Sequence, residues 1–170
     1  RQRFTIRGQH LVDDALRAVA DHGTEDLSVC HRHDDRARRQ CAEVNADHLG
    51  LLAEQRAAKG WPGAIVTNPN CSTVVLALAL APLRQFGIRA VVVSTMQAVS
   101  GAGYPGVPSL DILGNVVPFI GGEEEKMETE TLKILGSDGG RAPHAAAISA
   151  HTNRVPVIDG HTMTVSVDFE

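Results

Sequence analysis

The chain has 170 residues, of which 43% are hydrophobic and 21% charged, and its net charge of −4 reflects 20 acidic against 16 basic side chains. This size suits one globular domain, and the slight acidity provides no cationic field for nucleic acid or an anionic membrane surface. No apolar run reaches the roughly 18 residues of a membrane span, so we expect a cytoplasmic protein. Three cysteines are too few for a disulfide framework.

The first half of the chain is predicted to contain helices around one short strand. Residues 9–22 and 45–60 have the apolar spacing of amphipathic helices, the second with Asn45 as N-cap and Gly60 as its end. Residues 64–66 form a short apolar run typical of a buried strand. After a turn at Asn68-Pro69-Asn70, residues 72–83 predict a nearly all-apolar helix that other elements must cover.

The second half predicts strands on either side of one charged helix. Residues 88–93 predict a buried strand, and 98–110 a loop rich in glycine and proline. Residues 123–135 predict a helix, with three glutamates in its first turn and Gly136 after its end. We expect 155–158 to be extended and 161–169 to be a half-buried strand. The pattern favours an α+β or α/β fold with a mixed sheet under covering helices.

Two patterns resemble binding motifs but lack their context. Residues 101–106 fit G-x-G-x-x-G, but Pro105 and Pro108 forbid the helix that must receive a pyrophosphate. A second set offers zinc-type ligands at a spacing unlike that of structural zinc sites, so we expect no bound metal. This set consists of Cys30, His31, His33 and Cys41.

Cys71 is the strongest candidate for chemistry. It opens the apolar helix, where unpaired N–H groups and the helix dipole favour a thiolate. A free cysteine is more often a small packing residue. Here Asn68, Asn70 and Ser72 surround the sulfur with polar groups, as stabilisation of an oxyanion requires. We therefore predict a nucleophilic thiol with a lowered pKa.

A nucleophilic thiol needs a proton shuttle and an anchor for its substrate. Arg154 and His161 flank residues 155–158 and would share one cavity if that segment were extended. Spacing alone leaves a surface histidine and a solvated arginine as the alternative. Likewise, Glu123 and Lys126 are a solvated i, i+3 pair unless a site lies nearby.

Four motifs in order carry a resemblance to a known family. They are TNPNCST at 67–73, STMQAVSGAG at 94–103, GEEEK at 122–126 and NRVPVIDGH at 153–161. From about residue 43 onward the chain resembles aspartate-semialdehyde dehydrogenases, with the archaeal/fungal-like branch closest. N-acetyl-glutamyl-phosphate reductase and malonyl-CoA reductase use the same thiol chemistry and are the nearest alternatives.

The resemblance implies the catalytic domain of the glyceraldehyde-3-phosphate-dehydrogenase-like type. Its reaction is the NADPH-dependent reductive dephosphorylation of 4-phospho-L-aspartate to L-aspartate 4-semialdehyde through a cysteine thioester, in lysine, threonine and methionine biosynthesis. The implied catalytic residues are Cys71 as nucleophile, His161 as general acid/base and Gln97, which orients the reacting group.

The resemblance also implies how the ligands are held. Arg154 would bind the substrate α-carboxylate, Glu123 its ammonium group, Lys126 the phosphate and Asn70 the acyl or phosphate oxygens. Ser100 and Gly101 would lie beside the nicotinamide of NADP.

The likeness does not extend over the whole family pattern. Residues 1–42 match no part of it, so we expect the N-terminal Rossmann domain to be largely absent from this polypeptide, and residues 43–170 to form a catalytic and dimerisation domain that is incomplete at its C-terminus. We expect this polypeptide alone to bind NADPH weakly or not at all and to be inactive. We also expect a homo-oligomer, either dimer or tetramer. An inactive fragment that only associates, and a Cys/His hydrolase, are the alternatives.

Overall fold

The computed structural model describes residues 2–7, 27–29, 50–137 and 141–170. Its elements in chain order are β1 (Gln2–Arg7), β2 (Leu27–Val29), α3 (Gly50–Lys59), β3 (Ala64–Val66), α4 (Cys71–Leu80), the 3-10 helix η2 (Ala81–Phe86), β4 (Ile88–Gln97), the 3-10 helix η3 (Val99–Ala102), α5 (Ser109–Ile112), β5 (Val117–Pro118), α6 (Glu123–Ile134), β6 (Ala147–Arg154) and β7 (Thr162–Phe169). No helix in these ranges is long and apolar enough to cross a membrane. The predicted helix at 9–22 and the segment 30–41 lie outside the described residues.

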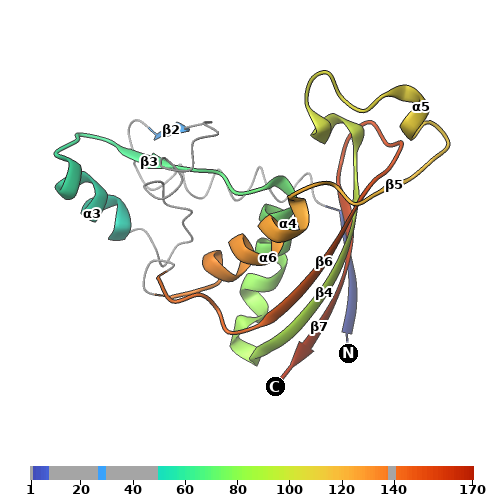
Figure 1. Cartoon of the computed structure of the whole chain (residues 1–170). Coiled ribbons are helices and arrows are strands. Elements are labelled where there is room, and N and C mark those ends of the chain that lie inside the picture. The colour runs from blue at the N-terminus through green and yellow to red at the C-terminus, as the bar shows by residue number, and fades with distance from the viewer. Residues whose placement is uncertain (1, 8–26, 30–49, 138–140) are drawn as a thin grey trace.

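A five-stranded mixed sheet forms the centre of the fold, in the order β1-β7-β4-β6-β5 (Figure 1). β4 and β6 are parallel, whereas the β1–β7, β4–β7 and β5–β6 pairs are antiparallel. A separate parallel pair joins β2 to β3. The predicted mixed sheet with covering helices is therefore confirmed.

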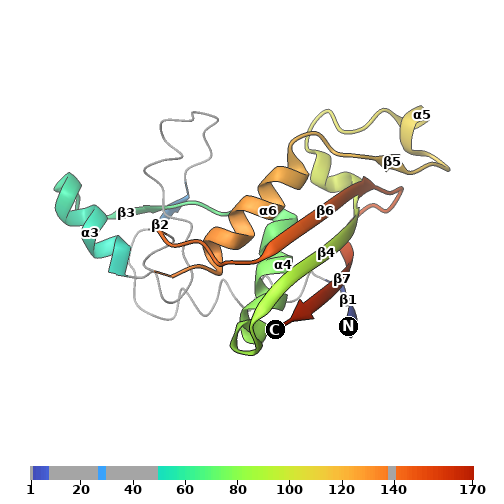
Figure 2. The same ribbon diagram turned by 60° about the horizontal axis from the view of Figure 1, so that its bottom comes forward.

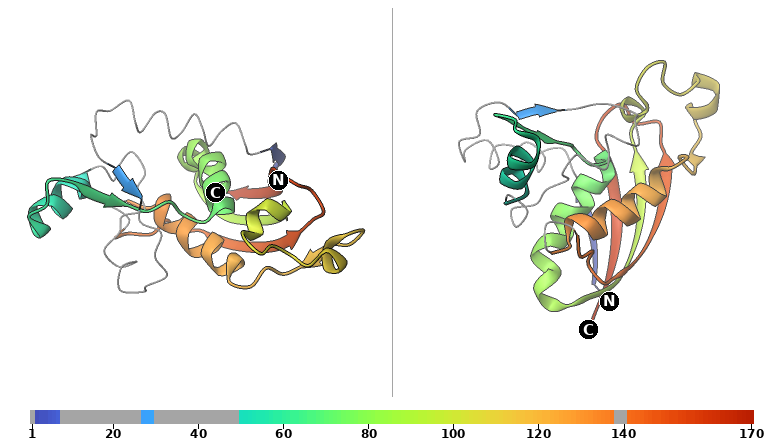
Figure 3. Two further views of the ribbon diagram at one scale, coloured as in Figure 1. Left: turned by 90° about the horizontal axis from the view of Figure 1, so that it is seen from above. Right: turned by 60° about the vertical axis from the view of Figure 1, so that its left-hand side comes forward.

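The helices α4 and α6 lie on the same side of the sheet (Figure 3). α4 is apolar on all its faces, as expected of a buried helix. Its residues Leu76 and Leu80 are 0% and 1% exposed. They share one core with Met127 of α6 and with the strand residues Val91 and Val93. α4 ends earlier than predicted because the chain tightens into η2, which has a proline in its first turn.

Several predicted elements are confirmed with small changes at their ends. α3 ends before Gly60, which has a φ of 65°. β3 matches its prediction, α6 ends one residue early, and β7 begins one residue late. β4 is longer than predicted and reaches Gln97.

The prediction of an extended segment at 155–158 is wrong, and the strand lies just before it, as β6. Pro156 has no N–H to donate to a sheet, and Val157 and Ile158 are 46% and 76% exposed. Residues 155–161 instead form a turn that leads from β6 to β7.

The parallel pair brings functional loops to one end of the sheet. β4 ends at Gln97 and β6 at Arg154, and these two residues are register partners. The start of α6, η3 and β5 gather at the same end (Figure 2). Ligand sites commonly lie beyond the carboxyl ends of parallel strands, and this end carries the candidate site.

Candidate active site

Asn70 shapes the turn that presents Cys71. Its side-chain Oδ1 accepts hydrogen bonds from Ser72 N at 3.0 Å and Thr73 N at 3.3 Å, so Asn70 is the N-cap of α4. Cys71 is the first residue of the helix and is exposed to solvent. The cap therefore fixes the backbone on both sides of the thiol.

His161 lies against this thiol, although 90 residues separate the two in the sequence. The distance between Cys71 Sγ and His161 Nε2 is 3.2 Å. The other ring nitrogen, Nδ1, accepts a hydrogen bond from Ala98 N at 3.1 Å. This network assigns the neutral tautomer with its proton on Nε2, facing the sulfur.

Arg154 is held on the same peptide segment. The residue is 6% exposed, and its Nη1 donates to the Ala98 carbonyl oxygen at 2.7 Å. The backbone continues the contact, because Val155 N donates to the Gln97 carbonyl at 3.0 Å. Arg154 and His161 are thus brought together by the end of β4.

The turn between β6 and β7 explains how His161 returns to this point. Val99 N donates to Val157 O at 2.8 Å, and Ser100 N donates to Ile158 O at 3.1 Å. The carbonyl groups of Val157 and Ile158 therefore attach the turn to the backbone of η3, although the side chains of both residues are exposed.

The thiol does not have the lowered pKa that the sequence predicted. Partial burial of the sulfur, and then the Glu123 carboxylate, raise the pKa of Cys71 above its ordinary value. The backbone N–H and hydroxyl of Ser72, and then Arg154, act in the opposite direction. The favourable helix end is present, but desolvation and a nearby carboxylate outweigh it.

His161 is shifted toward its neutral form. Burial, followed by the Arg154 guanidinium, lowers the pKa of the His161 ring, and Glu123 opposes this shift. Protonation of Nδ1 would also place two N–H groups against each other at Ala98. The pair at neutral pH is therefore a thiol beside an uncharged imidazole.

Glu123, Lys126 and Asn70 form a second group beside the thiol. Asn70 Nδ2 donates to Glu123 Oε2 at 2.6 Å, and Lys126 Nζ lies 3.9 Å from Glu123 Oε1. The Glu123 side chain is 17% exposed, compared with 39% for Lys126. The i, i+3 pair thus lies at the candidate site rather than on a remote solvated face.

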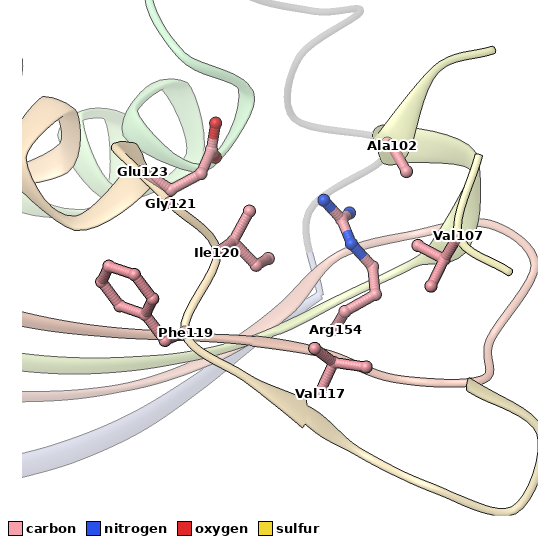
Figure 4. Close-up of a pocket in the computed structure, with 9 residues that line it drawn as sticks. Ala102, Val107, Val117, Phe119, Ile120, Gly121, Glu123 and Arg154 are labelled. Atoms are coloured by element: carbon pink, nitrogen blue, oxygen red, sulfur yellow. The ribbon is translucent and has the colours of Figure 1, made fainter. Parts of the chain in front are cut away.

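A cavity of about 420 Å³ extends from Glu123 to Arg154 (Figure 4). Glu123 and Arg154 are its two charged lining residues, and the rest of the wall is mainly apolar. This part of the lining consists of Gly101, Ala102, Val107, Val117, Phe119, Ile120 and Gly121.

Gly101 closes the gap between the cavity and the histidine. A Cβ atom at this position would lie 2.7 Å from His161 Cε1, 2.9 Å from its Nε2 and 3.0 Å from Arg154 Nη1. Only glycine fits without displacing these side chains. Ser100 and Gly101 are both exposed.

Gln97 is adjacent to Arg154 in the register of the parallel strands, is 1% exposed, and donates from Nε2 to Thr95 Oγ1 at 3.4 Å. In the described part of the chain, no cluster of three or more histidines, cysteines or acidic residues is arranged to hold a metal ion. The set between Cys30 and Cys41 lies outside it.

Sequence reasoning missed two contributors. Ala98 acts only through its backbone N–H and carbonyl groups, which no side-chain motif reveals. Glu130 Oε2 accepts from Asn70 N at 2.8 Å. Glu123 and Glu130 are two helical turns apart and so lie on the same face of the helix, and this relationship could have indicated Glu130 as a site residue.

Comparisons with known proteins show the family to which this chain belongs. Residues 80–170, more than half of the chain, match the family described as semialdehyde dehydrogenase, dimerisation domain. Aspartate-semialdehyde dehydrogenase of Archaeoglobus fulgidus is 59% identical over 130 residues, which are 75% of this chain and 38% of that protein. The Schizosaccharomyces pombe enzyme is 54% identical over 133 residues, 74% of this chain and 37% of that one.

A solved structure has the same fold. The crystal structure of aspartate semialdehyde dehydrogenase with NADP from Candida albicans matches with a TM-score of 0.64 and 39% identity, covering 79% of this chain and 42% of that one. The chain spans about 38% of the length of the Archaeoglobus relative that it matches. From the family match and these likenesses, the chain belongs to the semialdehyde dehydrogenase family and carries its dimerisation domain.

Proposed function

We propose that this chain provides the thiol and substrate-binding half of an aspartate-semialdehyde dehydrogenase, which reduces 4-phospho-L-aspartate to L-aspartate 4-semialdehyde with NADPH. The observation that carries the proposal is the contact of 3.2 Å between Cys71 Sγ and His161 Nε2, beside a cavity lined by Arg154 and Glu123. A thiol, an N–H donor and an anion clamp are what acyl transfer to sulfur requires.

The two charges of the cavity favour an amino acid with a free ammonium group. Arg154 binds the α-carboxylate through its planar guanidinium, and Glu123 faces the ammonium group, in a volume of about 420 Å³ that suits a small molecule. An N-acylated substrate has no positive charge for Glu123, and a malonyl group has none either. This favours the aspartyl substrate over those of the two related reductases.

In the proposed first step, the sulfur of Cys71 attacks the acyl carbon of the substrate. A C–S bond forms, the bond from carbon to the phosphate oxygen breaks, and phosphate leaves. Because Cys71 is exposed, its proton is released to solvent, while the Nε2–H group of His161 donates to the thiolate. The same N–H then donates to the oxygen on which negative charge develops.

The leaving phosphate has two neighbours in this proposal. Lys126 of α6 lies beside Glu123 at the candidate site, and its ammonium group attracts the phosphate oxygens. Asn70 uses Oδ1 and one Nδ2 hydrogen within the protein, which leaves its second Nδ2 hydrogen for an acyl or phosphate oxygen. Gln97, next to Arg154, orients the reacting group.

The residues at η3 fit the nicotinamide end of NADP. Gly101 has no side chain, and a Cβ there would meet the His161 ring at 2.7 Å, so the surface above the imidazole stays clear. Ser100 and Gly101 would hold the nicotinamide there. NADP, when bound, supplies or accepts a hydride at the acyl carbon. The Candida albicans enzyme, which is similar in fold, was solved with NADP.

We further propose a cytoplasmic homo-oligomer in which two copies pair through the open face of the sheet. α4 and α6 cover the other face (Figure 3). In the central strand β4, Val91 and Val93 belong to the core with these helices, so Val92, which is 54% exposed, lies on the open face. An exposed apolar side chain in a central strand favours a covering partner. The family of this domain is described by its role in dimerisation.

NADPH oxidation with 4-phospho-L-aspartate tests the proposed activity, with Cys71→Ala as the control. Because the chain provides only the thiol and substrate-binding half, we expect one equivalent of phosphate per chain, which the substitution abolishes, and little or no NADPH oxidation. Full NADPH oxidation would show that this chain binds the cofactor by itself. Continuous phosphate release without NADPH would favour the Cys/His hydrolase, and no release at all would favour the inactive fragment.

A further inference from the structure

α6 contacts both sides of the candidate site through four of its glutamates. On the thiol side it contacts Asn70, the residue before the nucleophile. Glu123 Oε2 accepts from Asn70 Nδ2 at 2.6 Å, and Glu130 Oε2 accepts from Asn70 N at 2.8 Å. These glutamates are seven residues apart, which is about two helical turns, so both project from one face. α6 therefore holds the turn before Cys71 through both the backbone and the side chain of Asn70.

On the other side, α6 contacts β6. Glu124 Oε1 accepts from Thr152 N at 2.9 Å, and Glu128 Oε1 accepts from Ala150 N at 3.0 Å. Four helical residues rise about 6 Å and two strand residues about 6.7 Å, so the two spacings match. Hydrogen bonds from backbone N–H groups to carboxylates are stronger than those between neutral groups.

These two sets of bonds lead to the two residues that hold the substrate in our proposal. Cys71 directly follows Asn70, and Arg154 is two residues beyond Thr152 on the same strand. Met127 and Thr131 of α6 are 0% exposed, so the helix is also packed into the core. A displacement of α6 at either set of bonds would change the distance between the thiol and the guanidinium.

We propose that α6 fixes the separation between the Cys71 thiol and the Arg154 guanidinium, and that Glu130 is the positioning residue on the thiol side. This separation selects the length of the carbon chain between the carboxylate and the carbon that sulfur attacks. The inference rests on the proposed function, because it takes Arg154 as the group that binds the substrate carboxylate.

Alkylation of Cys71 by bromoacetate, bromopropionate and bromobutyrate, each with a terminal bromine, tests this selection. A bond from Sγ to carbon forms, bromide leaves and the thiol proton passes to solvent. Each rate is divided by that of the matching amide, which has no carboxylate for Arg154. Mass spectrometry of the peptide that contains Cys71 separates its alkylation from that of Cys30 and Cys41.

Three variants separate reach from charge. Glu130→Asp keeps the charge but shortens the side chain by one carbon, and Glu130→Gln keeps an acceptor oxygen at the original reach. Glu125→Asp is the matched control, because Glu125 is an exposed glutamate of the same helix. Circular dichroism confirms that each variant is folded at the assay temperature.

We expect the acid-to-amide ratio of the unsubstituted chain to peak at one length. In Glu130→Asp the peak should fall about tenfold, since an ångström of misplacement costs about a hundredfold in rate. It should persist in Glu130→Gln and Glu125→Asp. If the peak is unchanged in Glu130→Asp, or if Glu130→Gln loses as much of it as Glu130→Asp does, the positioning role of Glu130 is overturned, while the proposed function stands. A flat ratio in the unsubstituted chain would overturn carboxylate binding by Arg154 and the inference with it.

Discussion

Arg154 and His161 are joined through a single residue, Ala98. The Ala98 carbonyl oxygen accepts from Arg154 Nη1 at 2.7 Å, and the Ala98 N–H donates to His161 Nδ1 at 3.1 Å. The guanidinium that binds the substrate carboxylate in our proposal and the ring beside the sulfur are therefore held by one stretch of backbone. The same contact sets the tautomer of the ring, which makes Nε2 a donor toward Cys71.

The first prediction concerns Glu123, whose carboxylate helps to raise the pKa of the Cys71 thiol. Removing that charge by Glu123→Gln lowers the pKa and increases the thiolate fraction at pH below it. Since one pKa unit changes that fraction tenfold, we expect alkylation of Cys71 by iodoacetamide at neutral pH to be about two- to tenfold faster. Glu125→Gln, at an exposed position of the same helix, is the control. A slower reaction in Glu123→Gln would contradict the assigned cause.

The second prediction concerns the role of His161. If its Nε2–H acts as a hydrogen-bond donor in the acylation step, the side chain need not transfer a proton, and a glutamine N–H can replace it in part. His161→Gln should then retain more acylation by 4-phospho-L-aspartate than His161→Ala. We expect a difference of about tenfold, the effect of one donor at a developing charge being up to about 10²–10³-fold. Equal rates in the two variants would favour a general acid/base, since neither glutamine nor alanine transfers protons at neutral pH.

The third prediction concerns Gly101, where a Cβ would meet His161 Cε1 at 2.7 Å and Arg154 Nη1 at 3.0 Å. Gly101→Ala should displace the ring or the guanidinium and reduce acylation by about tenfold or more, because small misplacements carry large rate costs. Gly50→Ala, where a Cβ meets nothing within 4 Å, is the matched control. Acylation by Gly101→Ala at the unsubstituted rate would show that the site tolerates the added methyl group.

The fourth prediction concerns the core beneath the site. Leu76 is 0% exposed and belongs to the cluster between α4 and the sheet. Leu76→Ala should reduce the free energy of unfolding by about 2–5 kcal/mol through lost burial and the cavity left behind. Leu110→Ala, at a side chain that is 95% exposed, should change it little. Denaturant unfolding measures both, and equal effects would place Leu76 outside the folding core.

The sequence predicted most of the elements because their patterns are local. The apolar run of α4, the charges and end of α6 and the alternation in β7 each depend on neighbouring residues alone. β6 was not predicted because its buried positions carry Ala150, Thr152 and Arg154, so its sequence, AISAHTNR, lacks the alternation of apolar and polar side chains. The apolar VPVI that follows it attracted the strand prediction, but Pro156 and its exposed neighbours belong to a turn.

The candidate site shows the same limit. Cys71, Arg154, His161, Glu123 and Asn70 were all named from the sequence, and the structure brings them to one end of the sheet. The sign of the thiol pKa shift was wrong, because the helix end is visible in the sequence whereas desolvation and the position of Glu123 depend on the fold. The roles of these residues, and the division into 1–42 and 43–170, stay predictions.

The central claim is that Cys71 forms a thioester with the aspartyl group, and mass spectrometry of the chain after brief mixing with 4-phospho-L-aspartate tests it most directly. This step needs no NADPH, so it depends only on residues of this chain. We predict one aspartyl adduct on the peptide that contains Cys71, removed by hydroxylamine and absent in Cys71→Ala. A chain without the adduct, or an adduct that persists in Cys71→Ala, would contradict the account.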